Sequence, residues 1–423
     1  MPNANKRERV IFLADCQSFY ASIEKAAHPA YAHKPLVVSG DPARRSGIIL
    51  AACPLAKAKG ITTAEALWQA QQKCPEVIVV RPRMGTYIQI SLQIMNILES
   101  YSDLVEPFSI DEQFVDITAS LAHFNCSPRE LAKHIQMRVQ NEIGIYIRVG
   151  IGRNKILAKM ACDNFAKKNG DGIYELNDAT METLWACPVK SMFGVGSRTA
   201  RHLNRIGLYT IGDVAATPLG DLKQKMKQYM KKNCDIWSEV LWRTAKGWDD
   251  SPVTPDAFDG QKGIGRQTTL PVDFHSREEI DVVLRELSMM ICSRARAKGY
   301  MGTVVSAGAQ GADFDRPVGF SRQLKLEEPS HISREIYAAA RKLFDTHWGG
   351  HAVRKIWVSL DGLQSDAVHQ LSLFGEREKQ MQLEHTMDEI QDAFGREAIF
   401  FGSSLTHSSQ LRLMNTKIGG HYK

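Results

Sequence analysis

Two adjacent acids, Asp111 and Glu112, are the residues of this 423-residue chain whose types and spacing best suit catalysis. A third acid, Asp15, follows a short apolar run, residues 10–14, which has the composition of a buried strand. Carboxylates at strand ends are costly to desolvate unless they are paired, and a hard divalent cation such as Mg²⁺ is a natural partner. Three carboxylates from two strands can hold two such ions about 3.5–4 Å apart, an arrangement that supports in-line phosphoryl transfer. We therefore expect these three acids to be catalytic metal ligands.

An Asp-Glu pair by itself is ambiguous, because aspartate is common in solvated turns between strands. The neighbouring residues favour the catalytic interpretation. Asp15 leads into Cys-Gln-Ser-Phe-Tyr-Ala-Ser-Ile-Glu at 16–24, and the acid pair lies within Ser-Ile-Asp-Glu-Gln-Phe-Val-Asp at 109–116. Both segments resemble the metal motifs of the Y-family (lesion-bypass) DNA polymerases. The resemblance extends from about residue 8 to residue 374, and its motifs follow the family's order.

The resemblance implies an α/β multidomain fold, a polymerase right hand. Strands and helices that alternate along residues 9–173, and again after 262, agree with mixed α/β domains. The implied parts are a palm, small fingers, a helical thumb with a helix-hairpin-helix, an α/β little finger and a tail. Their expected bounds are 1–27 and 81–173 (palm), 28–80 (fingers), 174–246 (thumb), 247–261 (linker), 262–363 (little finger) and 364–423 (clamp-binding motif and C-terminal tail). In the tail we expect a helix at 379–394 and a short strand at 398–401.

Composition excludes several other classes of protein. Hydrophobic residues make up 43% of the chain and charged residues 24%, and no apolar run approaches the roughly 18 residues of a membrane span. The apolar run before Asp15 is too short for a secretion signal, so we expect a cytoplasmic protein. The eight cysteines form no CxxC pair, which argues against disulfides and a zinc site. A net charge of +6 is compatible with nucleic acid but is weak support for it.

The resemblance also implies a deoxynucleoside triphosphate site near Asp15. Tyr20 matches the family's steric gate, whose ring excludes a 2′-hydroxyl, although Phe19 or Tyr20 could equally be a core aromatic. Two basic residues, Lys57 and Lys167, match lysines that balance phosphate charge, and Lys168 remains an alternative to Lys167. The resemblance further implies that the backbone carbonyl of Cys16 is a metal ligand. The nucleotide would be bound by backbone N–H groups, a hydroxyl and ammonium groups. The residues that supply them are Gln17, Ser18, Phe19, Tyr20, Lys57 and Lys167.

A second implied contact is with DNA. Gly194-Val195-Gly196 would join two short amphipathic helices, with Ser197 capping the second. Glycines let the backbone approach a phosphate, and a helix N-terminus presents free N–H groups to it. Within the resemblance, Gly194, Gly196 and Arg198 are expected to contact DNA phosphates.

Near the C-terminus, one short segment resembles the bacterial sliding-clamp-binding motif. Such a peptide inserts apolar anchors into a groove of its partner. In an anonymous chain it would be taken for a buried strand end. The segment consists of Gln370, Leu371, Ser372, Leu373 and Phe374.

Two departures from the family pattern bear on subtype. Gln17 stands where many members have a second acid, and Pro54 and Lys57 stand where others have Tyr and Arg. These departures suggest a chain closer to the polymerase V catalytic subunit than to polymerase IV, with possible accessory activator subunits.

The function expected from the resemblance is template-directed translesion DNA synthesis with two Mg²⁺ ions, in DNA damage tolerance. Primer-template DNA, deoxynucleoside triphosphates and the sliding clamp would be its partners. The alternative is a non-catalytic DNA- and clamp-binding regulator at stalled forks. A nucleotidyl cyclase would use similar acids but has no use for a thumb hairpin or a clamp peptide.

Overall fold

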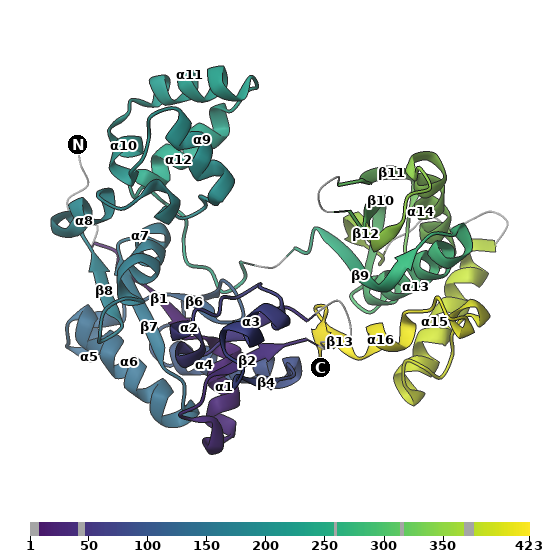
Figure 1. The fold of residues 1–423 in the computed structure, drawn as a ribbon, viewed down its shortest axis with the longest axis horizontal. Coiled ribbons are helices and arrows are strands. Elements are labelled where there is room, and N and C mark those ends of the chain that lie inside the picture. Colours follow the sequence, from purple (N-terminus) through teal and green to yellow (C-terminus); the bar gives the residue numbers. More distant parts are fainter. Residues whose placement is uncertain (1–7, 41–46, 258–259, 314–316, 368–375) are drawn as a thin grey trace. The chain divides into compact units, whose positions relative to one another are not determined.

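The computed structural model describes residues 8–40, 47–257, 260–313, 317–367 and 376–423 (Figure 1). The chain divides into two compact units. The first comprises Met1–Val38, Ile49–Val80 and Gly85–Ala257, and the second comprises Ser39–Ile48, Arg81–Met84 and Phe258–Lys423.

A five-stranded sheet forms the centre of the first unit. The order of the strands is β5 (Val105–Pro107), β6 (Glu112–Asp116), β1 (Ile11–Cys16), β7 (Ile147–Gly152) and β8 (Ile173–Leu176). The central strand β1 is antiparallel to both neighbours, and all six of its residues are buried. Its register places Asp15 opposite Glu112 on one side and opposite Arg148 on the other. The expected strand before Asp15 is therefore confirmed, and strand pairing brings two of the predicted acids side by side.

Helix α7 (Lys155–Ala161) packs unusually closely on β7. A Cβ atom at Gly150 would lie 2.1 Å from the carbonyl oxygen of Ala158, so only glycine permits this approach. Asn154 caps the helix by accepting the N–H of Leu157, and a π-helical turn, Cys162–Ala166, continues it. This close contact holds the side chains of α7 beside the end of β1.

Shorter elements complete this part of the unit. Helix α6 (Pro128–Ile143) begins at a Ser127/Glu130 capping box and ends at Gly144, whose φ of 78° is left-handed. A second sheet has the strand order β3 (Ile49–Ala52), β2 (Leu36–Ser39), β4 (Ile78–Val80). The remaining helices here are α1 (Phe19–Ala27), α2 (Pro54–Ala58), α3 (Leu67–Lys73), α4 (Met84–Glu99) and α5 (Leu121–Phe124).

The region from 178 to 245 is helical. Its helices are α8 (Met181–Trp185), α9 (Ser197–Arg205), α10 (Ile211–Ala216), α11 (Leu219–Met230) and α12 (Asp235–Ala245). The expected pair of helices around the Gly-Val-Gly turn is partly wrong, because a single 3₁₀ turn, Val189–Ser191, precedes it. Gly196, not Ser197, is the N-cap of α9, since Gly196 is extended while Ser197 already belongs to the helix.

The second unit is built on a four-stranded antiparallel sheet. Its strand order is β11 (Gly319–Ser330), β10 (Tyr300–Gly311), β12 (Val353–Ser365), β9 (Gly263–Phe274). Helices α13 (Arg277–Arg296) and α14 (Ser333–His347) pack on it (Figure 1). Along β12, Ile356, Val358 and Leu360 enter the core, and the residues between them are only partly buried. Such alternation is typical of a sheet with one covered face.

We call residues 376–423 the C-terminal segment. It contains α15 (Glu376–Phe394), α16 (Leu411–Asn415), β13 (Lys417–Ile418) and β14 (His421–Tyr422), so the helix expected at 379–394 is confirmed. The strand expected at 398–401 is wrong; the strands pair instead across Gly419 and Gly420, whose positive φ angles suit a tight hairpin turn. The expected clamp-binding residues, 370–374, lie outside the described residues. Within the described ranges, no helix combines the length and apolar character needed to cross a bilayer.

The close packing of α7 gives a stability prediction. Gly150→Ala should lower the free energy of unfolding by about 1–3 kcal/mol, because the added methyl group overpacks the contact between α7 and β7. Gly85→Ala is the matched control, since a Cβ atom there meets nothing within 4 Å. Chemical denaturation followed by circular dichroism measures both variants. Equal stability of the two would contradict the packing analysis.

Candidate active site

The predicted acids converge at one end of β1. Asp15 and Glu112 are cross-strand partners, and the N–H of Cys16 donates to the backbone carbonyl of Asp111 at 2.9 Å. Carboxylate oxygens of Asp15, Glu112 and a further acid, Asp163, lie within 4.8 Å of one another and could hold a metal ion. Asp111 and these strand-end acids Asp15 and Glu112 line one pocket, and Asp111 accepts a hydrogen bond from the Ser109 hydroxyl at 2.7 Å. Four acids therefore surround this site.

Two lysines of the α7 region balance these acids. The Lys167 ammonium lies 2.6 Å from an Asp15 oxygen and 2.7 Å from an Asp163 oxygen. The Lys159 ammonium lies 2.6 Å from Glu112 and 3.0 Å from Asp163. Three clustered carboxylates facing two ammonium groups leave one negative charge uncompensated when all are ionised. A cation therefore fits this donor set.

The pKa values of the acids reflect this excess charge. Burial, together with a hydrogen bond to Glu112, raises the pKa of Asp15 to about 7, against the opposing effect of Lys167. The pKa of Glu112 is lowered: burial opposes this shift, but the hydrogen bonds from Asp15 and Lys159 outweigh it. Below about pH 7 Asp15 is therefore protonated, and a bound cation would compete with that proton.

The expected nucleotide-binding residues line a pocket of about 660 Å³ beside the acids. Most of them come from the end of β1, the start of α1 and helix α2, whereas Lys167 follows the π-helical turn Cys162–Ala166. The lining includes Cys16, Gln17, Ser18, Phe19, Tyr20, Lys57, Arg148 and Lys167. Lys168 is not part of this lining, so the structure favours Lys167 of the two lysines left open by the sequence.

The start of α1 supplies several polar groups to this pocket. Lys57 donates to the Ser18 hydroxyl at 2.9 Å. Burial and the nearby charges of Lys167 and Arg148 lower the pKa of Lys57. The N–H of Gln17 already donates to the Tyr146 carbonyl, so the expectation that it is available to a ligand is wrong. The first helical N–H groups, which have no partner within a helix, remain suited to an anion.

Tyr20 and Phe19 differ in their surroundings. Phe19 is buried, 3% exposed, whereas Tyr20 is partly exposed and stacks on Tyr87 with ring centroids 4.5 Å apart. Tyr87 is itself fully buried and donates to Glu24 at 2.7 Å. A fixed second ring therefore supports the Tyr20 ring beside the pocket.

The sequence analysis did not predict three residues of the site: Lys159, Asp163 and Arg148. The spacing of Lys159, Asp163 and Lys167, four residues apart, was a usable signal, because such residues share one face of a helix. Arg148 had no such signal. It lies opposite Asp15 in the sheet, and its guanidinium donates to the backbone carbonyl of Lys167.

The residues expected to contact DNA lie in the helical region. Gly194 has a φ of 79°, which favours glycine, and a Cβ atom at Gly194 or Gly196 would meet nothing within 4 Å. Arg198 is exposed in the first turn of α9. The backbone of this turn is therefore open to close approach.

The raised pKa of Asp15 predicts a pH-dependent stability. In metal-free protein its stabilising contribution is present below the unfolded pKa, about 4, and is lost as pH rises through about 7. Asp15→Asn cannot ionise, so its melting temperature relative to wild type should rise across pH 4–7 and then level off. Thermal melts in EDTA measure this, with the exposed Asp103→Asn as the control for a lost surface carboxylate. A flat difference for Asp15→Asn would contradict the electrostatic analysis.

Two protein-family models match this chain, one in each of the two structural units. Residues 14–163 match the impB/mucB/samB family, and residues 261–373 match the impB/mucB/samB family C-terminal domain. The first match contains the four acids of the site together with Lys57 and Lys159, and Lys167 lies just beyond its end.

Several relatives that are named as DNA polymerases match nearly the whole chain. The chain is 54% identical to DNA polymerase IV 2 of Bacillus subtilis (strain 168), over 99% of this chain and 100% of that protein. It is 48% identical to DNA polymerase IV 2 of Halalkalibacterium halodurans, over 98% and 100%. These names do not support the expected closer resemblance to the polymerase V catalytic subunit.

Solved structures agree on the fold. A Y-family DNA polymerase chimera, Dbh-Dpo4(243-245)-Dbh, is similar with a TM-score of 0.70 and 24% identity, over 83% of this chain and 98% of that one. An insertion ternary complex of Dbh DNA polymerase has a TM-score of 0.57 and 25% identity, over 84% and 98%. With the family models and the near full-length relatives, this likeness shows that the chain belongs to the Y family of DNA polymerases and is a DNA-directed DNA polymerase of the translesion type.

Proposed function

We propose that the pocket beside β1 joins a deoxynucleoside triphosphate to the 3′-end of a DNA primer. The observation that carries this proposal is the cross-strand pair of Asp15 and Glu112 in a pocket that three basic residues also line. The acids suit metal ions, and Lys57, Arg148 and Lys167, which line the same pocket, suit a triphosphate. A regulator without catalytic activity would have no use for this combination of clustered acids and basic residues in one pocket.

The acids Asp15, Asp111 and Glu112, with the carbonyl of Cys16, would hold two Mg²⁺ ions. When bound, such ions activate the attacking hydroxyl and neutralise charge on the leaving pyrophosphate. Burial, together with the neighbouring Glu112, raises the pKa of Asp15, so a cation that binds there would offset the cost of keeping both carboxylates ionised. Asp163 contacts both lysines and so fixes their ammonium groups against the acids.

The remaining residues bind and orient the nucleotide. The start of α1 and the Ser18 hydroxyl would donate to phosphate oxygens, and Lys57 lies next to that hydroxyl. Lys167 contacts the Asp15 carboxylate, so it would neutralise phosphate charge close to the metal ligands. The Tyr20 ring, held by Tyr87, would lie under the sugar and exclude a 2′-hydroxyl.

The parts of the hand are assigned on the same basis. The five-stranded sheet would be the palm and the three-stranded sheet the fingers. The helical region with Gly194, Gly196 and Arg198 would be the thumb, where exposed backbone can contact DNA phosphates without reading sequence. The four-stranded sheet would be the little finger, with the sliding clamp bound by residues 370–374.

Loss of one metal ligand should abolish catalysis. Asp111→Ala should reduce primer extension with Mg²⁺ by more than about 100-fold, since removing a partner of a metal ligand alone costs 10–100-fold. Asp103→Ala, on an exposed acid nearby in sequence, is the matched control and should extend normally. Addition of EDTA should stop both. Normal extension by Asp111→Ala would refute the assignment.

Sugar selection should depend on the Tyr20 ring. Tyr20→Ala should raise ribonucleotide incorporation relative to deoxynucleotide incorporation by at least about tenfold, a difference of ~1.4 kcal/mol. Tyr20→Phe keeps the ring and should discriminate as wild type does. Single-nucleotide insertion assays with matched triphosphates measure the ratio. Unchanged selectivity in Tyr20→Ala would place the steric gate elsewhere.

A further inference from the structure

Arg148 is placed in the active-site pocket by the central sheet itself. It lies on β7 directly opposite Asp15 of β1, and Asp15 lies opposite Glu112 of β6. Cross-strand partners share one face of a sheet, so the three side chains form a row across adjacent strands. Glu112 is on one side of Asp15 and Arg148 is on the other. Neighbouring strands are about 4.8 Å apart, so the arginine begins one strand spacing from the acids.

The guanidinium of Arg148 has only part of its hydrogen-bonding capacity in use. One Nη nitrogen donates to the backbone carbonyl of Lys167. The Nε nitrogen is buried and has no hydrogen-bond partner in the part of the chain that the structure describes. Within those same ranges the guanidinium forms no ion pair, because the neighbouring Asp15 pairs with the Lys167 ammonium. A buried donor without a partner is costly, so this group is suited to accept a ligand.

A second cation of the same pocket is also without a carboxylate partner. Lys57 donates to the Ser18 hydroxyl, and among the described residues it forms no ion pair. Burial, followed by the charges of Lys167 and Arg148, lowers the pKa of Lys57, so these cations lie close enough to repel one another. An anion bound between Lys57 and Arg148 would remove that repulsion. Two uncompensated positive charges match a group with at least two negative charges.

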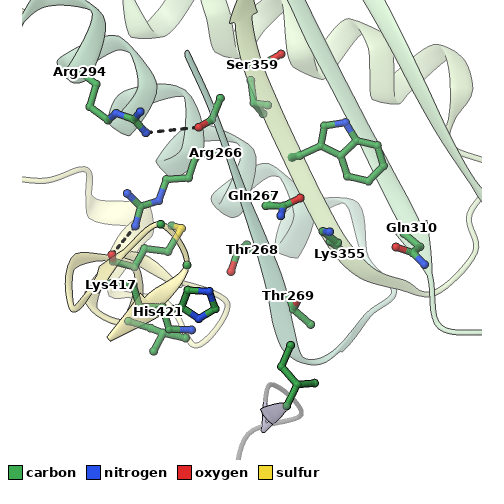
Figure 2. A pocket seen from close by; sticks show the side chains of 18 residues that line it. Arg266, Gln267, Thr268, Thr269, Arg294, Gln310, Lys355, Ser359, Lys417 and His421 are labelled. Carbon is green, nitrogen blue, oxygen red and sulfur yellow. Dashed lines mark hydrogen bonds between the residues drawn. The ribbon is translucent and has the colours of Figure 1, made fainter. Parts of the chain in front are cut away.

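An arginine-rich pocket of the second unit shows what the acids add. Arg266 and Arg294 line a pocket of about 910 Å³, and each donates to a backbone carbonyl, as Arg148 does (Figure 2). None of the described residues that line this pocket is an aspartate or a glutamate. Of the two pockets, only that of Arg148 therefore combines arginine with acids that suit metal ions, and metal ions accompany a triphosphate.

We propose that Arg148 binds the pyrophosphate that leaves the incoming nucleotide, by contacting its β- and γ-phosphates. This inference rests on the proposed function and assigns one step of it to a residue. In that step the primer 3′-oxygen forms a bond to the α-phosphorus, and the hydroxyl proton passes to water. The bond from the α-phosphorus to the bridging oxygen breaks, and its electron pair stays on pyrophosphate. With the α-phosphate at the acids, the row across the strands places the leaving group on the side of Arg148.

A guanidinium suits this role better than an ammonium group does. It stays protonated, so it can offset the charge that develops on the leaving oxygen without giving up its own proton. Its planar donors can contact two phosphate oxygens at once. The hydrogen bond to the Lys167 carbonyl already restricts the side chain, so less conformational freedom is lost on binding. Because the charge on the leaving group grows during the reaction, Arg148 should raise kcat as well as nucleotide affinity.

The test uses the full-length enzyme, with pyrophosphate and Mg²⁺ as the probe. Arg148→Ala should weaken pyrophosphate binding by at least about tenfold in isothermal titration calorimetry, the effect of losing one charge-assisted hydrogen bond. The same variant should lower kcat and raise KM in single-nucleotide insertion. Arg294→Ala is the matched control, since it removes an arginine from the pocket of Figure 2. At saturating primer-template it should match wild type in both measurements.

A double variant separates direct binding from support of the Lys167 backbone. If Arg148 acted only by holding Lys167, adding Arg148→Ala to Lys167→Ala would cause no further loss of pyrophosphate affinity. We expect a further loss of at least about fivefold, because the two side chains contact different phosphate oxygens. Absence of that further loss overturns the proposal, as does equal pyrophosphate affinity of wild type and Arg148→Ala.

Arg148→Lys is the conservative variant. It keeps the charge but not the planar donors, so it should recover part of the pyrophosphate affinity lost in Arg148→Ala. Where Arg148→Ala does not fold, Arg148→Lys is compared with wild type instead. A smaller loss of affinity is then expected, and no loss overturns the proposal.

Primer extension by wild type separates this inference from the proposed function. Failure of wild type to extend a primer with Mg²⁺ would refute the proposed function itself. Extension by wild type, together with unaltered pyrophosphate affinity in Arg148→Ala, would refute only the role of Arg148.

Discussion

The neutralisation of two adjacent carboxylates, the buried Asp15 and the partly buried Glu112, is the constraint on which the rest of the first unit depends. Antiparallel pairing of β1 with β6 sets these acids side by side, where their repulsion would be severe without compensation. Helix α7 supplies Lys159, and the π-helical turn that continues it leads to Lys167; the helix reaches the strand only because Gly150 lets its backbone approach. The strand pairing, the close packing of α7 and the protonation of Asp15 thus act together to limit repulsion between the two carboxylates. A bound metal ion would take over part of this neutralisation.

The sequence was sufficient to find the acids of the site, since Asp15, Asp111 and Glu112 lie in short motifs that follow or precede strands. It was not sufficient to find Asp163, whose role depends on how α7 docks against β1, and docking is a tertiary property. The opposite case is Arg148, an unremarkable residue in sequence that strand register places opposite Asp15. Local sequence patterns therefore identify residues that can be catalytic, whereas strand register and helix packing determine which residues lie in the same site.

The predictions of helix and strand boundaries were wrong where two local sequence signals favoured different boundaries. Serine is a good N-cap, yet Gly196 caps α9, because the chain enters the helix one residue earlier than the serine predicts. The apolar run at 398–401 reads as a strand but has no strand to pair with, and the paired residues lie instead on either side of Gly419 and Gly420. Charge patterning shows the same limit: a net charge of +6 gave no sign of the arginines and lysines that line the pocket of Figure 2, which arises only where the end of the chain folds back onto β9.

The central claim is that the acids at the end of β1 are the metal ligands of a polymerase. The most direct measurement is anomalous diffraction from crystals with primer-template DNA, an incoming nucleotide and Mn²⁺ in place of Mg²⁺. We expect two manganese peaks contacted by Asp15, Asp111 and Glu112, with the Lys167 ammonium moved from Asp15 toward the phosphates. Peaks held by other residues, or no manganese beside Asp15, would contradict the claim.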